Sequence, residues 1–153
     1  MQAFLEEAKR SSRTIANLST AVKNRVLNEM ADALMNHCDF IVTHNEKDMS
    51  EAKLNNLSES LQDRLLLTGD RVKDMADAIR QIASQLEPVG RILDGWVTKD
   101  GLNIQKVSIP IGVIGIIYES RPNVTSDTAA LCFKSGNVCV LKGGKEAEHS
   151  NKA

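Results

Sequence analysis

Apolar side chains recur at every third or fourth position through the first 86 residues, which is the spacing of one buried helical face. The helices are expected to begin after residues that commonly cap helix N-termini, namely Ser19, Ser58 and Thr68. The segment 39–56 has a more broken pattern, which predicts one or two short helices. Pro88 is expected to end the last helix, because proline lacks the backbone donor that a helix needs. The pattern thus predicts a helical first half.

The period of the pattern changes at Val89 from helical to strand-like. Residues 89–97 and 102–109 predict two short, half-polar strands. The Asp100-Gly101 pair between them is a strong hairpin signal, because both residues tolerate the backbone of a tight turn. Polar residues alternate in the second strand, so one of its faces is expected to meet solvent or a partner subunit.

The segment that follows predicts a strand, a helix and a second strand. Val113–Tyr118 is an apolar, β-branched run of the kind found in a strand that is buried on both faces. Val124–Lys134 is expected to be helical, and Gly136-Asn137 is a stop signal directly after it. Val138–Leu141 is the second apolar strand. This order predicts a parallel βαβ unit, in which ligands bind beyond the carboxyl ends of the strands.

Polar residues follow both predicted strands at that ligand-facing edge. After the first strand, the Asn123 side chain either donates to a developing oxyanion or caps the following helix, and spacing alone favours the cap. After the second, Lys142 and Lys145 flank a Gly-Gly pair, which is consistent with an anion site or with an ordinary solvated loop. The dinucleotide fingerprint G-x-G-x-x-G is absent from this edge.

Composition narrows the possible functions. A chain of 153 residues with 42% hydrophobic and 25% charged residues fits one soluble globular domain or a fragment of a larger protein. A net charge of −1 and 3% aromatic residues provide no electrostatic or stacking basis for nucleic-acid binding. No apolar run approaches the roughly 18 residues of a membrane span, and the N-terminus lacks a signal-peptide core. A cytoplasmic protein is expected.

The cysteines and histidines predict no metal site and no nucleophile. Cys38, Cys132 and Cys139 form no C-x-x-C pair, and an odd number of cysteines argues against a disulfide framework. Cys132 and Cys139 have apolar neighbours, so they are expected to be buried and unreactive. His44 and His149 show no carboxylate at a useful spacing and are expected to be surface residues.

The βαβ segment is the last part of the chain. Two parallel strands do not make a stable doubly wound sheet by themselves. The sheet is therefore expected to be completed either by the remainder of a longer protein, of which this chain is a truncated piece, or by another polypeptide. Truncation is the favoured interpretation.

Two motifs close the two strands of the βαβ unit, and they read YESRPNVT and LKGGKEA. Together with the preceding stretch LSESLQDRLLLTGDRVKDMADAIRQIASQLEPVGRILDGW, they resemble the γ-glutamyl phosphate reductase family of the aldehyde dehydrogenase superfamily. The resemblance implies an α/β fold. Residues 1–88 would form the N-terminal helical part of the cofactor domain, 89–109 a β-hairpin oligomerisation element, and 110–153 the first, incomplete βαβ unit of the cofactor-binding sheet.

The resemblance also implies roles for the polar edge. In that superfamily an asparagine after the first strand holds the oxyanion, so this role takes precedence over capping for Asn123. The lysine that closes the next strand contacts the cofactor ribose, and Lys142 matches it, with Gly143 and Gly144 following. Relatives that prefer NAD have a glutamate where this chain has Lys145. An ammonium cannot accept a hydrogen bond from a ribose hydroxyl, but it pairs well with a 2′-phosphate, so NADP(H) is the expected cofactor.

The implied reaction is the NADPH-dependent reduction of γ-glutamyl phosphate to glutamate-5-semialdehyde and phosphate in proline biosynthesis. A cysteine thiolate attacks the acyl phosphate, and a hydride then reduces the thioester. That cysteine belongs to a downstream catalytic domain, so the chain alone is expected to be inactive and to form a homo-oligomer. No metal, nucleic acid or membrane takes part.

Two other interpretations stay open. The chain also resembles the reductase part of a bifunctional pyrroline-carboxylate synthase, although Met1 opens straight into the first helix with no kinase domain before it. A non-catalytic helical assembly or binding module, whose strands pair with another chain, is the third possibility.

Overall fold

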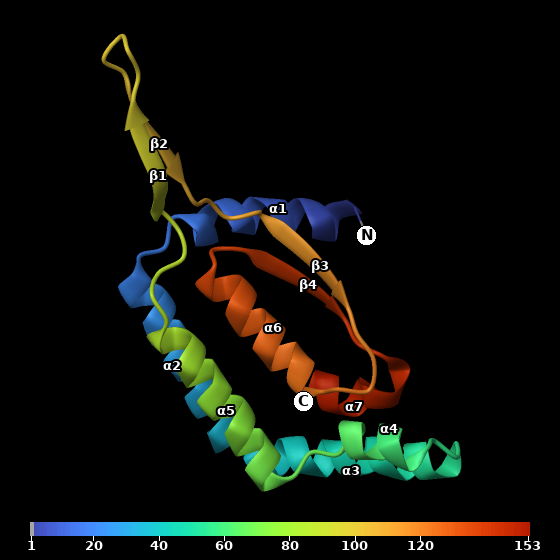
Figure 1. Ribbon diagram of the computed structural model, residues 1–153. Coiled ribbons are helices and arrows are strands. Elements are labelled where there is room, and N and C mark those ends of the chain that lie inside the picture. The colour runs from blue at the N-terminus through green and yellow to red at the C-terminus, as the bar shows by residue number, and fades with distance from the viewer. Residues whose placement is uncertain (1) are drawn as a thin grey trace.

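The computed structural model describes residues 2–153 (Figure 1). Five helices come first, followed by a hairpin and a strand–helix–strand unit. In chain order the elements are α1 (Gln2–Ala16), α2 (Thr20–Asn36), α3 (Cys38–Leu54), α4 (Glu59–Leu65), α5 (Gly69–Ser84), β1 (Ile92–Val97), β2 (Asn103–Val107), β3 (Val113–Ile117), α6 (Asn123–Lys134), β4 (Val138–Lys142), the 3₁₀ turn η1 (Lys145–Ala147) and α7 (Glu148–Lys152). The predicted order of helices, hairpin and βαβ unit is confirmed.

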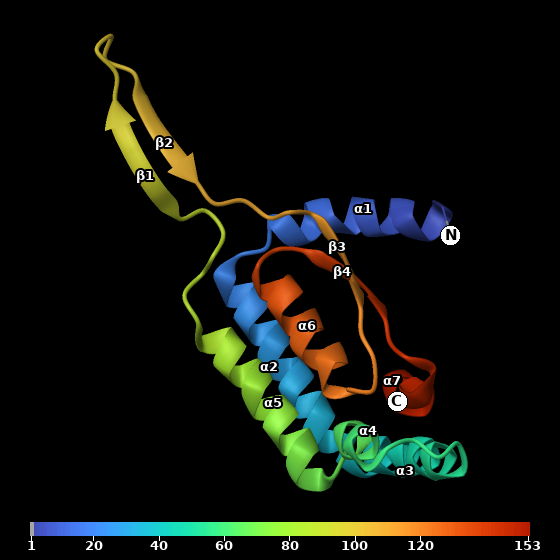
Figure 2. The same cartoon turned by 45° about the vertical axis from the view of Figure 1, so that its right-hand side comes forward.

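Helices α2, α5 and α6 lie side by side and form the main core, with β3 and β4 between α6 and α1 (Figures 1 and 2). The buried residues at the centre of this layer are small or aliphatic: Leu27, Ala31, Ala76, Ile79, Ile82, Ala83 and Ala130. Small residues let the three helix axes approach closely, and branched residues fill the grooves between them. A second layer, formed by α3, α4 and α7, lies across the end of this bundle (Figure 2).

The three predicted helix caps are all present. The Ser19 side chain accepts from the Val22 amide at 3.4 Å, and Ser58 and Thr68 cap α4 and α5 in the same way. Each cap satisfies one backbone N–H that the first helical turn leaves without an intrahelical partner. The N-termini of these three helices could therefore be predicted from local sequence.

Two predictions about the helices were wrong: the continuity of the helix after residue 38 and the end of α5. Residues 38–54 form one unbroken helix, α3, whose buried face is Ile41, Asn45, Asp48 and Ala52. Half of that face is polar, so the apolar residues alone did not show the regular spacing of a helix. Helix α5 ends at Ser84, four residues before Pro88, because Gln85 already has extended backbone angles.

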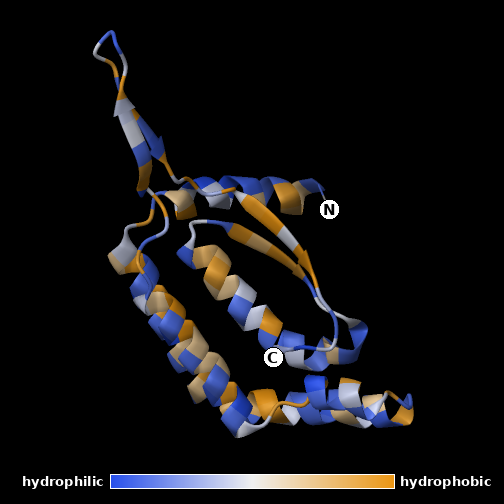
Figure 3. Ribbon diagram, viewed as in Figure 1, coloured by the Kyte–Doolittle hydropathy of each residue, from blue (hydrophilic) through white to orange (hydrophobic). Residues whose placement is uncertain are grey.

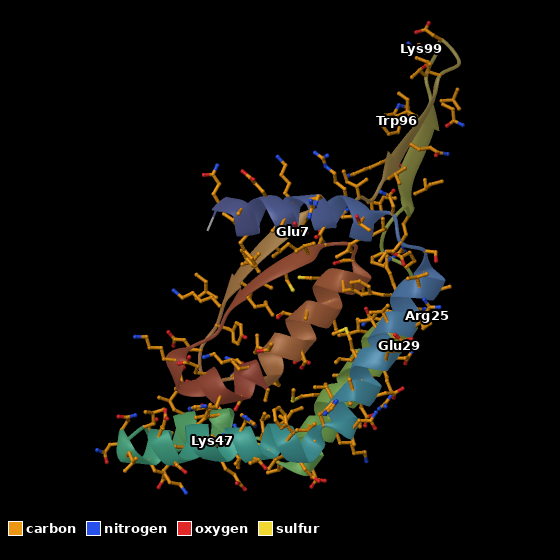
Figure 4. All side chains as sticks on the ribbon, turned by 180° about the vertical axis from the view of Figure 1, so that it is seen from behind. Glu7, Arg25, Glu29, Lys47, Trp96 and Lys99 are labelled. Atoms are coloured by element: carbon orange, nitrogen blue, oxygen red, sulfur yellow. The ribbon has the colours of Figure 1, made fainter. Side chains whose placement is uncertain are left out.

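The β1–β2 hairpin projects away from the helices (Figure 1). Its strands pair in antiparallel register, and Gly101 takes a φ of +82° at the turn, as the Asp-Gly signal predicted. Every residue of β1 is exposed, and Trp96 lies on the part of the hairpin that projects beyond the helices (Figure 4). Within this structure the hairpin therefore contributes little to the core.

Strands β3 and β4 form the predicted parallel pair, from Val113↔Val138 to Ile117↔Lys142. The helix between them ends as predicted: Gly136 has φ +74°, and the Asn137 amide reaches back to the Cys132 carbonyl at 2.8 Å.

The predicted burial of β3 on both faces was wrong. Ile117 is 81% exposed, because within residues 2–153 these two apolar strands have no further strand beside them (Figure 3). An apolar sequence indicates that a strand can be buried on both faces. Whether it is buried depends on which strands and helices pack beside it.

A buried ionic cluster joins the upper ends of α2, α5 and α6. Lys23 of α2, only 1% exposed, donates to the Glu87 carboxylate at 2.7 Å. Lys134 of α6, 2% exposed, donates to the Asn24 side chain at 2.6 Å and to the Ala83 carbonyl at 2.8 Å. Burial would raise the pKa of Glu87, but the hydrogen bonds from Lys23 and from the Val89 amide outweigh it and lower that pKa. The cluster holds three helix ends at fixed positions.

We expect Glu87→Gln to lower the free energy of unfolding by about 2 kcal/mol at pH 7, because it leaves the Lys23 ammonium buried without a counter-charge. The pKa of Glu87 is lowered in the folded state, so its stabilisation is present at neutral pH and is lost as the pH falls through that pKa. The difference between wild type and variant should therefore shrink in acid. Urea denaturation at both pH values measures it.

The matched control is Glu29→Gln. Glu29 pairs with Arg25 at 3.7 Å on the outer face of α2, where both side chains are largely exposed (Figure 4). We expect a change below about 0.5 kcal/mol there. Equal effects of the two variants would contradict a special role for the buried cluster.

Candidate functional site

The two predicted polar segments leave the sheet at the same edge. Ile117 and Lys142 are partners in the parallel register, and the Tyr118 amide donates to the Lys142 carbonyl at 3.1 Å. Because the strands are parallel, both chains turn away from the sheet at their carboxyl ends. The βαβ topology thus places the segment before α6 beside the segment after β4.

Asn123 is the first residue of α6. The capping alternative was wrong, because Pro122 occupies the N-cap position and no side chain caps this helix. The Asn123 Nδ2 instead donates to the Asp127 Oδ2 at 3.1 Å, one helical turn further on. An amide nitrogen carries two hydrogens, so this bond orients the side chain and leaves the second N–H available to a ligand.

A cleft of about 440 Å³ opens beside Asn123, between the start of α6 and helices α4 and α5. Most of its lining residues are charged: Asp63, Arg64, Arg71, Asp74, Arg121 and Asp127, with Leu66, Leu67, Met75, Ala78 and Asn123 completing the wall. This volume lies within the range typical of small-molecule sites. The cleft combines a free amide donor with charges of both signs.

Asp127 is the least solvated acid of the cleft. Its Oδ1 atom is buried and has no hydrogen-bond partner within residues 2–153. Burial raises the pKa of Asp127, and the hydrogen bond from Asn123 offsets only part of that rise. A carboxylate held in this way is ready to accept a further donor.

The segment after β4 presents two cationic side chains. Lys142 ends the strand and Lys145 begins η1, and both are exposed. The glycines between them lie against side chains of the same segment. A side chain at Gly143 would collide with Asn151, and one at Gly144 with Glu146. These glycines make room for the protein's own side chains.

Glu146 fixes the loop between β3 and α6. Its Oε1 accepts from the backbone amide and the hydroxyl of Ser120, each at 2.7 Å. Ser120 has a φ of +43°, a left-handed conformation that is uncommon for a residue with a side chain. The carboxylate of one polar segment thus holds the backbone of the other, just ahead of Asn123.

Sequence reasoning missed Arg64, Arg71 and the aspartates of the cleft. Arg64 and Arg71 lie on or next to helices that were read only for their apolar faces, and no local motif relates them to Asn123. Asp127 carried one usable signal, since it stands four residues after Asn123 on the same helical face. The other lining residues come together only through tertiary packing.

Cys132 is buried as predicted, Cys139 is only half-buried, and one histidine also differs from its prediction. Burial raises the pKa of Cys132 and of Cys139, which leaves both as unreactive thiols at neutral pH. Cys38 is half-buried. The expectation that His149 lacks a carboxylate partner was wrong, because its Nε2 lies 3.3 Å from Glu51 on α3. His44 contacts the Phe40 carbonyl at 2.9 Å.

Among the helices of residues 2–153, none combines the length and apolar character needed to cross a bilayer.

We expect Asp127→Asn to stabilise the fold at pH 7, by less than about 1 kcal/mol, because it removes a partly desolvated charge. The pKa of Asp127 is higher in the folded state than in the unfolded state. Its charge therefore lowers the stability of the wild type as the pH rises from the unfolded-state pKa to the folded-state pKa. The advantage of the variant should therefore vanish in acid, where the wild-type carboxyl is protonated. Thermal unfolding across pH measures it.

Glu46→Gln, an exposed acid of α3, is the matched control and should leave stability almost unchanged. A wild type more stable than Asp127→Asn at pH 7 would show that the carboxylate is satisfied and not strained.

Comparisons of sequence and of structure with known proteins lead to the same family of enzymes. No protein-family model matches the chain. Over all 153 residues it is 80% identical to the γ-glutamyl phosphate reductase of Aliarcobacter butzleri and 66% identical to that of Sulfurovum sp., and it spans 37% of the length of each.

Solved structures agree with the sequences. The γ-glutamyl phosphate reductase of Thermotoga maritima superposes with a TM-score of 0.92 at 40% identity, over 96% of this chain and 36% of that protein. The Saccharomyces cerevisiae enzyme gives 0.91 at 34% identity, over 95% of this chain and 37% of that one. A benzaldehyde dehydrogenase from Corynebacterium glutamicum, 20% identical with a TM-score of 0.63, shares the fold over 95% of this chain and 29% of its own. This chain therefore matches γ-glutamyl phosphate reductases in sequence over its whole length, which is 37% of theirs, and in fold over 95–96% of its residues.

Proposed function

We propose that the chain is part of an NADP(H)-dependent reductase that converts γ-glutamyl phosphate to glutamate-5-semialdehyde and phosphate, a step of proline biosynthesis. The observation that carries this proposal is the 80% identity, over every residue of the chain, to a protein named for that activity. The cleft beside Asn123 provides a place for the acyl group.

In this proposal Asn123 stabilises the acyl oxygen while it gains negative charge. The Asn123 amide already donates one hydrogen to Asp127, and this bond fixes the side-chain conformation. The direction of the second amide hydrogen is therefore fixed as well. A donor fixed in advance stabilises a developing oxyanion more than a mobile one does, because no reorganisation is needed during the reaction.

Lys142 and Lys145 are the residues that we assign to the cofactor, with Gly143 and Gly144 shaping the turn between them. Two exposed ammonium groups at the carboxyl edge of a parallel sheet suit a phosphate-bearing nucleotide. Lys145 cannot accept a hydrogen bond from a ribose hydroxyl, which favours a 2′-phosphate there. The cofactor would supply the hydride for the reduction.

The nucleophilic cysteine, by this proposal, comes from a part of the reductase that this chain does not contain. Cys132 and Cys139 have raised pKa values through burial, which disfavours the reactive thiolate. The acyl group would pass to that cysteine as phosphate leaves, and Asn123 would act on the same oxygen in this step and in the reduction.

We further propose three structural regions: residues 1–88 as the helical part of the cofactor domain, 89–109 as an oligomerisation element, and 110–153 as the start of the cofactor-binding sheet. The projecting hairpin, with Trp96 52% exposed, supports self-association into a homo-oligomer. Free cysteines throughout residues 2–153 are compatible with the reducing cytoplasm, where we place the reaction.

We expect Lys145→Glu to weaken NADPH binding by about tenfold, because a carboxylate replaces the ammonium assigned to the 2′-phosphate. NADH lacks that phosphate, so its binding should weaken much less. Titration of the chain with each nucleotide, followed by cofactor fluorescence, measures both. Lys99→Glu at the tip of the hairpin makes the same charge change far from the sheet edge and serves as the control (Figure 4). Equal losses for both nucleotides would contradict the assignment.

The role of Asn123 is testable in a complete enzyme. We expect the Aliarcobacter butzleri reductase to stay active when this chain replaces its matching segment, and Asn123→Ala in that chimera to lower kcat by about 10²–10³ with little change in KM. Turnover can be followed as NADPH formation from glutamate-5-semialdehyde, phosphate and NADP⁺. A kcat within a factor of two of the unmodified chimera would remove Asn123 from the mechanism.

A further inference from the structure

The charges of the cleft beside Asn123 are balanced overall but largely unpaired. Arg71 and Asp63 pair with each other at 2.7 Å. Within residues 2–153, no ion pair engages the remaining charged residues of the cleft, which are Arg64, Arg121, Asp74 and Asp127. Charged side chains that face one cleft without pairing to each other are available to a ligand that carries both signs.

Asp127 is the acceptor on the inner wall. Its Oδ2 receives the Asn123 amide, whereas its Oδ1 is buried without any donor in the described part of the chain. A carboxylate oxygen that has lost water and gained no hydrogen bond carries a penalty, which an ammonium ligand in the cleft relieves by compensating the charge of the carboxylate.

Arg121 is the cation closest in sequence to the reacting position. Its exposed side chain lines the cleft two residues before Asn123, in the loop that Glu146 fixes through Ser120. A guanidinium binds a carboxylate with two parallel hydrogen bonds, which sets the orientation of the bound group. Arg64, across the cleft on α4, can add its charge to the same anion.

We infer that this cleft recognises the α-amino acid end of the substrate, with the ammonium on Asp127 and the α-carboxylate on Arg121. Asn123 and Asp127 are joined by a 3.1 Å hydrogen bond, so a ligand anchored on Asp127 needs only a short chain to reach the Asn123 amide. In a glutamyl group, two methylenes separate the α-carbon from the acyl carbon, which is such a chain. The inference rests on the proposed function for the identity of the acyl group. It adds the residues that select an amino acid over a simple dicarboxylate.

Two analogues isolate the two contacts. Glutarate is glutamate without the α-ammonium, and 4-aminobutyrate is glutamate without the α-carboxylate. We expect L-glutamate to shift the backbone NMR signals of residues 121–127 and 63–78 of the isotope-labelled chain, with no cofactor present. Each analogue should bind about tenfold more weakly, which is the loss expected for one charged contact in a cleft open to water.

Two substitutions assign the contacts to residues. Asp127→Asn should reduce the affinity for L-glutamate to that for glutarate and leave glutarate binding unchanged. Arg121→Ala should reduce it to that for 4-aminobutyrate. Glu46→Gln, outside the cleft, should change neither. Wild-type-like spectra of the free variants establish that they fold.

The comparison of L-glutamate with its two analogues uses the unmodified chain, so it remains valid even if a variant does not fold. Equal binding of L-glutamate and glutarate, shifts confined to other residues, or no saturable shift with glutamate would each overturn the inference. A failure here leaves the nucleotide result for Lys145→Glu intact. A failure of that nucleotide test, in turn, leaves the amino-acid cleft intact, so the two outcomes are distinguishable.

Discussion

The buried ammonium of Lys134 determines where the candidate residues lie. It sits at the C-terminal end of α6 and donates to Asn24 of α2 and to the last turn of α5. Helix α6 spans 12 residues, so a constraint at this end fixes the direction of a rod of about 18 Å. Asn123 and Asp127 occupy the opposite end of that rod. The ionic cluster far from the cleft therefore aims the amide that the proposed chemistry uses.

Opposing effects act on the pKa of Lys134 within the same cluster, and their balance lowers it. Burial lowers the pKa of Lys134, Glu87 raises it, and the neighbouring Lys23 lowers it again. Two lysines share one carboxylate, and the remaining ammonium hydrogens go to amide and carbonyl oxygens, which accept them without adding charge. An ionic group of this kind adds little stability compared with an apolar core, but it tolerates only one arrangement of its partners. Its hydrogen bonds connect α2 and α6 to the end of α5 and to Glu87 just beyond it.

Local signals explain which parts of the fold could be predicted from sequence. The caps at Ser19 and Thr68, the Asp-Gly turn and the glycine stop after α6 each depend on one or two residues and their own backbone, so they were predicted correctly. Helix α3 was not, because Asn45 and Asp48 hide its buried face. Asn45 binds the backbone of Leu65 and of Leu67, and Asp48 accepts the amides that begin α7. Those partners are 20 to 102 residues away, and no window of local sequence contains them. The cleft was missed for the same reason.

The contrast between satisfied and unsatisfied buried oxygens argues for where a ligand belongs. Asn45 and Asp48 are 1% exposed, and their side chains are fully engaged by backbone and hydroxyl groups. Within residues 2–153, the buried side-chain oxygens without a partner are those of Glu87 and Asp127. Glu87 already pairs with Lys23 through its other oxygen, so its charge is compensated. Asp127 has only a neutral amide as partner and faces a cleft with further charges. This fold satisfies its polar groups elsewhere and leaves the Asp127 carboxylate without a charged partner, beside the proposed oxyanion donor. That arrangement carries a cost that a bound cation would reduce.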